Sequence, residues 1–150
     1  TITGFLDIIA IVTFMLIYTV KIYRQIIGFN FFYSSLTAIF FVMSCYLFGV
    51  SFQNSFIGTS SFYFPIVLHL LFLIIYFLFL NLTFDCLKYL IFSTLIFSAS
   101  IILRVIDQPI CNIFPLGTHF LWHILNAIFL FFLIKFSYLT CNRSSPEEPT

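Results

Sequence analysis

The sequence predicts an all-α integral membrane protein, a polytopic bundle with five transmembrane helices in this chain. Its 150 residues are 62% hydrophobic and only 7% charged, whereas an ordinary soluble domain has about 25% charged residues. The mean hydropathy is +1.16. The apolar residues are gathered into five runs, each near the roughly 20 residues that a helix needs to cross a bilayer. These three observations together predict the fold class.

Polar residues, glycine or proline separate the five runs. In chain order the runs are residues 5–23, 31–50, 62–80, 87–103 and 118–139. The stretches between them are residues 24–30, 51–61, 81–88 and 104–117. We expect the helices to end there, because glycine and proline favour turns and polar residues favour water. After the fifth run, residues 140–150 include Ser-Ser-Pro-Glu-Glu-Pro, a composition that predicts a disordered tail.

The basic residues predict the orientation of the bundle. Most of them follow the first run, lie between the third and fourth, or lie at the end of the fifth: Lys21, Arg24, Lys88, Lys135 and Arg143. The opposite set of helix ends has Arg104, three residues before Asp107, and this spacing at a helix end predicts a structural ion pair between them. Cytoplasmic loops carry the excess of lysine and arginine, so we expect a cytoplasmic C-terminus and tail. The net charge of +1 offers nothing to a nucleic-acid partner.

A small set of ionisable side chains is expected to share one layer near the non-cytoplasmic face. His119 and His123 are four residues apart, which places them on one face of a helix, one turn apart. Asp7 lies near the start of the first run, and His69 lies early in the third. Odd-numbered helices run in the same direction, so these residues are expected at similar depth. Ionisable groups in lipid are costly and usually functional.

This layer suits a metal ion, although other interpretations stay open. Imidazole nitrogens bind zinc, and a catalytic zinc has three protein ligands plus a water. His119 and His123 are the candidate metal ligands, and Asp7 is the candidate catalytic base. Alternatively, the histidines form polar contacts between helices, and His69 is either a buried bundle histidine or a substitute ligand. Trp122 is of the type enriched at membrane interfaces.

Two stretches resemble the C-terminal end of alkaline ceramidase-like membrane proteins, most closely their bacterial members. They are Arg-Val-Ile-Asp-Gln-Pro-Ile-Cys at 104–111 and Pro-Leu-Gly-Thr-His-Phe-Leu-Trp-His-Ile-Leu-Asn-Ala at 115–127. Phe-Leu-Asp-Ile-Ile at 5–9 is similar to the sequence around an aspartate that starts the family's third helix. The resemblance covers nearly all of the chain. The family belongs to a superfamily of seven-helix proteins that includes the progestin and adiponectin receptors.

The resemblance implies a zinc ion bound by three histidines. Two of them match His119 and His123, and Asp7 matches the family's catalytic aspartate. The third histidine belongs to a Ser-x-x-x-His element shortly before that aspartate, and six residues precede Asp7 here without such an element. We therefore expect this chain to be the C-terminal part of a seven-helix bundle, with the third ligand outside it.

The resemblance also implies a function, namely zinc-dependent hydrolysis of a linear amide bond in a lipid such as ceramide, a step of sphingolipid metabolism. The substrate would enter from the surrounding membrane lipids, and the bacterial resemblance favours a plasma membrane. The alternatives are a non-catalytic or receptor-like protein of the same superfamily, and an inactive fragment that lacks the third ligand. Residue types alone decide neither the natural lipid, nor the role of His69, nor the oligomeric state.

Overall fold

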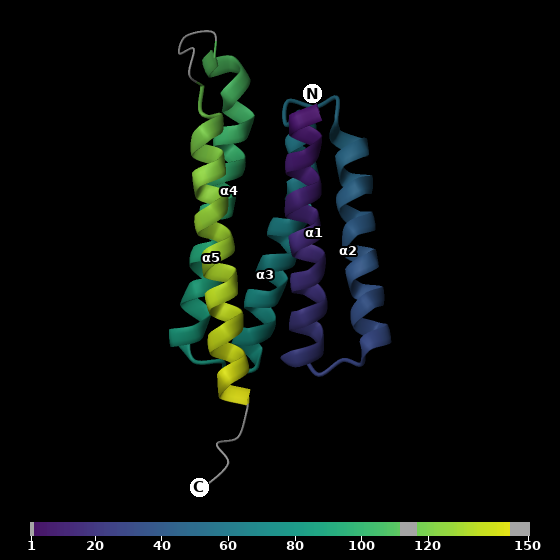
Figure 1. The fold of residues 1–150 in the computed structure, drawn as a ribbon, viewed down its shortest axis with the longest axis vertical. Coiled ribbons are helices and arrows are strands. Elements are labelled where there is room, and N and C mark those ends of the chain that lie inside the picture. The colour runs from purple at the N-terminus through teal and green to yellow at the C-terminus, as the bar shows by residue number, and fades with distance from the viewer. Residues whose placement is uncertain (1, 112–116, 145–150) are drawn as a thin grey trace, which may run out of the picture.

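A computed structural model describes residues 2–111 and 117–144, with side chains for 6–58, 60–107 and 117–141. All of its regular elements within these residues are helices (Figure 1). They are α1 (Ile2–Gln25), α2 (Phe31–Phe52), the 3-10 helix η1 (Gly58–Tyr63), α3 (Phe64–Phe79), α4 (Phe84–Cys111) and α5 (His119–Ser144). Five helical stretches are long and apolar enough to cross a membrane. The predicted all-α, multi-pass membrane bundle is confirmed.

The helices alternate in direction and form two pairs joined by a fifth helix. α1 lies beside α2, α4 lies beside α5, and α3 contacts both α2 and α4 (Figure 1). The N-terminal ends of α1 and α5 lie at the same end of the bundle, the upper end in Figure 1. The C-terminal end of α5 lies at the opposite end. This arrangement brings residues from the two extremes of the sequence to one level.

Two helices, α4 and α5, continue at least five residues past the C-terminal ends of the hydrophobic runs that predicted them. α4 continues to Cys111 rather than ending at residue 103, and α5 continues to Ser144 rather than ending at residue 139. The polar residues Arg104 and Asp107 do not end α4, because each has a partner on a neighbouring element, as described below. Five residues of the predicted tail are thus helical, and residues 145–150 lie outside the described part of the chain.

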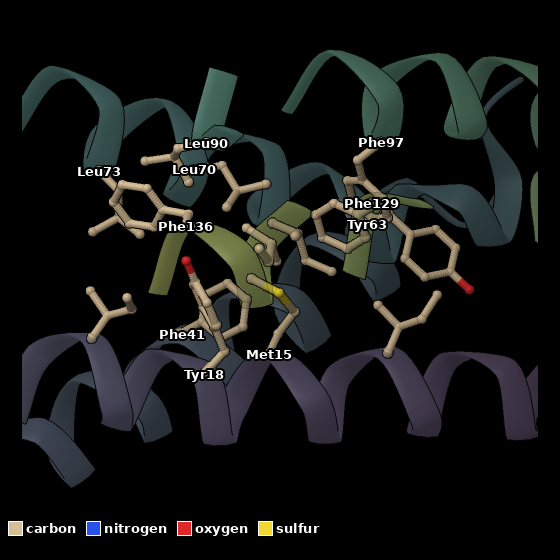
Figure 2. Packing of buried hydrophobic residues seen from close by; sticks show 14 of the residues in the cluster. Met15, Tyr18, Phe41, Tyr63, Leu70, Leu73, Leu90, Phe97, Phe129 and Phe136 are labelled. Carbon is tan, nitrogen blue, oxygen red and sulfur yellow. The ribbon is translucent and has the colours of Figure 1, made fainter. Parts of the chain in front are cut away.

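Apolar side chains join all the helices in one buried cluster. In Figure 2, Met15 and Tyr18 of α1 extend toward the side chains of α3 and α5. Phe97 of α4 stacks on Phe129 of α5 with ring centroids 4.3 Å apart. The outer surface is apolar as well; for example, Phe79 is 81% exposed. Large apolar side chains on the outside are costly in water and suit a lipid environment.

One buried polar pair links α4 to α5. The Ser100 hydroxyl donates a hydrogen bond to the Asn126 side-chain oxygen at 3.0 Å, and both side chains are buried. Hydrogen bonds of this kind hold membrane helices together, because an apolar solvent offers polar groups no other partner. The pair lies about one turn below Arg104 on α4 and one turn below His123 on α5.

The 3-10 helix packs against α2 because residue 49 has no side chain. A Cβ atom at Gly49 would overlap the ring of Phe62. Ser61, also in η1, donates a hydrogen bond from its hydroxyl to the carbonyl oxygen of Gly49 at 3.3 Å. These contacts seat η1 against the bundle, and its last residue, Tyr63, is fully buried.

Gly49→Ala is expected to lower the free energy of unfolding by about 1–3 kcal/mol, the usual cost of forcing an extra carbon into a packed site. Reversible unfolding in mixed detergent micelles measures this cost. The matched control repeats the substitution in a Phe62→Ala background, where the overlapping ring is gone and the cost should fall close to zero. An equal cost in both backgrounds would contradict this explanation.

Candidate metal centre

The candidate site lies where the N-terminal ends of α1 and α5 meet the C-terminal part of α4. Asp7 comes from the second turn of α1, and Arg104 from the last two turns of α4. His119 is the first residue of α5, and His123 follows one turn later. Four polar residues from three helices therefore converge at one end of an otherwise apolar bundle.

The structure brings together the three residues that the sequence singled out. Asp7, His119 and His123 each offer one potential ligand atom, and these atoms all lie within 4.8 Å of one another. The Asp7 Oδ2 atom is 3.9 Å from His119 Nε2. The two imidazole rings have centroids 4.7 Å apart and are nearly perpendicular. Within the described residues this is the group of histidine and acidic side chains that could hold a metal ion.

The site is partly open. The Asp7 side chain is 21% exposed and the His119 side chain is 44% exposed, while His123 is exposed. An incoming ion or ligand can therefore reach the imidazole nitrogens without displacing the backbone. Trp122 forms the closed side, since it is 1% exposed and stacks on His119 at 5.3 Å between centroids.

Arg104 also belongs to this site, where the sequence suggested a different arrangement. Its Nη1 atom lies 4.0 Å from Asp7 Oδ2, and its side chain is only 10% exposed. The guanidinium carbon lies 4.3 Å from the Trp122 ring centroid and 5.6 Å from that of Tyr63, both within cation–π range. Arg104 is thus held between two aromatic rings and a carboxylate from another helix.

Asp107 fixes the start of α5 and thereby the position of His119. Its Oδ1 atom accepts a hydrogen bond from the Thr118 backbone N–H at 2.6 Å and lies 3.3 Å from the Thr118 hydroxyl. That hydroxyl also donates to the carbonyl oxygen of Leu103 at 2.7 Å. A carboxylate at a helix N-terminus satisfies N–H groups that have no partner in the helix itself.

His69 is not part of this site, contrary to the expected common depth. It is partly buried and lies beside Tyr23, Phe41 and Thr19, with Nε2 3.5 Å from the Thr19 hydroxyl oxygen. Thr19 follows Asp7 by 12 residues on α1, a rise of about 18 Å. The expectation failed because Tyr63 already lies beside Trp122 at the level of the site. His69 follows six residues later and is therefore further along the bundle axis.

The sequence did not point to Tyr63 or to the buried position of Trp122. Tyr63 ends η1 and lies 6.0 Å from Trp122 between ring centroids. Trp122 packs against both histidines and is almost fully buried. The only local signal was the position of Trp122 within His-Phe-Leu-Trp-His, which places it one turn from His119.

No family model, curated protein or solved structure matches this chain. The ceramidase-like assignment therefore remains a prediction from the residues quoted above. The geometry of Asp7, His119, His123 and Arg104 stands independently of it.

Asp107→Ala is expected to loosen the start of α5, at a cost of about 0.5–2 kcal/mol, as for a lost helix cap. Amide hydrogen exchange at Thr118 in detergent should become faster. Asp107→Asn keeps an oxygen acceptor at the same place and should show a smaller change in both stability and exchange. If the alanine variant exchanged at the wild-type rate, Asp107 would not anchor the helix.

Proposed function

We propose that this chain is a membrane-embedded, zinc-dependent hydrolase that cleaves the linear amide bond of a lipid such as ceramide, as part of sphingolipid metabolism. The observation that carries the proposal is the convergence of Asp7 with His119 and His123. In this proposal the site lies near the non-cytoplasmic face of a bacterial plasma membrane, with the C-terminus in the cytoplasm.

The residues present fit a zinc ion. Histidine nitrogens and a carboxylate oxygen are regular zinc ligands, and two histidines with one carboxylate occur in catalytic zinc sites. Ligand atoms on one tetrahedral zinc lie roughly 3.3 Å apart, given bonds of about 2.0–2.1 Å. Atoms within 4.8 Å of one another reach this spacing by small side-chain rotations. Asp7 is available either as the third ligand or as the base.

The proposed reaction is the addition of water across an amide bond. Zinc, when bound, polarises the substrate carbonyl and makes a bound water nucleophilic at neutral pH. Asp7 would orient the attacking water and accept its proton, while His119 and His123 would hold the ion. The water oxygen becomes bonded to the acyl carbon, the carbon–nitrogen bond breaks, and the proton passes to the leaving amine. The products are a fatty acid and an amine, which for ceramide is a sphingoid base.

One observation favours a second candidate, a non-catalytic or receptor-like membrane protein. Arg104 and His119 both lie within 4.0 Å of Asp7. The Asp7 carboxylate therefore has partners for its charge without a metal ion. Such a layer can hold helices together and serve only packing. The two candidates differ in turnover, because a structural or receptor protein binds lipid without releasing fatty acid.

The purified protein, stripped with a chelator and then titrated with zinc, is expected to bind about one ion per chain. His119→Ala and His123→Ala should each weaken binding by roughly tenfold or more, since even changes around metal ligands cost 10–100-fold. His69→Ala is the matched control, because it removes a histidine outside the site and should leave zinc binding unchanged. Equal loss in all three variants would point to non-specific binding.

Asp7→Asn is expected to reduce lipid amide hydrolysis by about 10²–10⁴-fold, the usual contribution of a general base. Release of fatty acid from a ceramide in mixed micelles measures this. Asp85→Asn is the control, since Asp85 is 75% exposed and pairs with Lys88. Full turnover in Asp7→Asn would remove this residue from the reaction, and no turnover in the zinc-loaded wild type would favour the non-catalytic candidate.

A further inference from the structure

The candidate site has more buried hydrogen-bond donors than acceptors. Arg104 Nη1, Trp122 Nε1 and the Tyr63 hydroxyl are all buried without a hydrogen-bond partner among the described residues. The Arg104 guanidinium lies over both aromatic rings, so the three groups belong to one cluster. Leaving buried donors without acceptors costs free energy. A cluster of this kind is suited to a ligand that supplies acceptor oxygens.

Arg104 is the charged member of this cluster and faces the site. Nη1, its unpartnered atom, is the atom that lies 4.0 Å from Asp7 Oδ2. This separation is too long for a hydrogen bond. Packing against the Trp122 ring restricts the plane of the guanidinium, which presents its donors in a fixed fork. A guanidinium oriented in this way matches the geometry of a carboxylate.

The polarity of the site favours the same kind of ligand. Asp7 compensates the charge of Arg104 from 4.0 Å but leaves Nη1 without a hydrogen bond. A ligand carboxylate supplies that hydrogen bond with charge assistance, whereas a neutral ligand supplies at most a weaker one. Exposed apolar side chains flank the site on both helices, with Leu6 57% and Ile124 51% exposed, and offer a surface for an acyl chain.

We propose that Arg104 is the carboxylate-binding residue of this site and that its ligand is a long-chain carboxylic acid. The inference rests on the proposed function, because such an acid is the acyl product of lipid amide cleavage. Binding itself needs neither zinc nor turnover. Nη1 donates to a carboxylate oxygen, and the chain lies along the apolar side chains of α1 and α5. Asp7 competes with the ligand for Arg104.

The test measures palmitate binding to the chelator-treated protein in detergent. Trp122 is the only tryptophan of the chain and packs on Arg104, so its fluorescence reports on occupancy. Palmitate is expected to bind about tenfold more tightly than palmityl alcohol, the difference made by one charge-assisted hydrogen bond. Arg104→Gln should remove this preference, and Asp7→Asn should strengthen palmitate binding by removing the competing carboxylate.

Lys135→Gln is the matched control, because it removes one positive charge at the other end of α5 and should leave palmitate binding unchanged. Equal binding of acid and alcohol by the wild type would overturn the proposal, even if Arg104→Gln did not fold. So would wild-type palmitate binding in Arg104→Gln, or equal losses in Arg104→Gln and Lys135→Gln. Palmitate binding through Arg104 without any amide hydrolysis would refute the proposed function alone.

Discussion

The contact of one carboxylate with partners from two other helices determines how this end of the bundle is assembled. Asp7 lies in an apolar helix, where an isolated charge is expensive. Its neighbours are Arg104 of α4 and His119 of α5, both within 4.0 Å. The polar layer therefore ties α1 to the α4–α5 pair at this end, while the buried apolar cluster joins the same helices further along. The side chains of the candidate site therefore also link these three helices.

The position of His119 depends on a second set of contacts behind the first. The Asp107 carboxylate accepts a hydrogen bond from the Thr118 N–H, and the Thr118 hydroxyl donates one to the Leu103 carbonyl oxygen. Both interactions connect the end of α4 to the first turn of α5. The histidine that begins α5 is thereby fixed on the helix end itself rather than on a loose loop, which is the kind of support that a metal ligand requires.

Patterns that act along one helix could be predicted from the sequence. The apolar runs predicted five membrane helices, and the i, i+4 spacing predicted that His119 and His123 share a face. Alternation of helix direction brought Asp7 to their level. Partners across helices could not be predicted. Arg104 and Asp107 are three residues apart and suggested an ion pair, yet each contacts a different element, because the rotation of α4 about its axis is set by packing.

The depth of His69 could not be predicted for a related reason. Hydropathy marks where a segment is apolar but not where it enters the bundle. η1 packs on α2, where Gly49 leaves room for Phe62, and Tyr63 is already buried beside Trp122 before α3 begins. His69 follows on α3 and contacts residues near the other end of α1.

The Ser100–Asn126 hydrogen bond fixes the axial position of α5 relative to α4, and with it the position of the histidines. Helices with smooth apolar faces can slide along each other at little cost, and a slip of one turn displaces a helix by about 5.4 Å. Because both imidazoles are on α5, such a slip would carry them together past the carboxylate on α1. The Asn126 amide, which belongs to none of the three candidate ligands, thus sets the axial position of both imidazoles relative to Asp7.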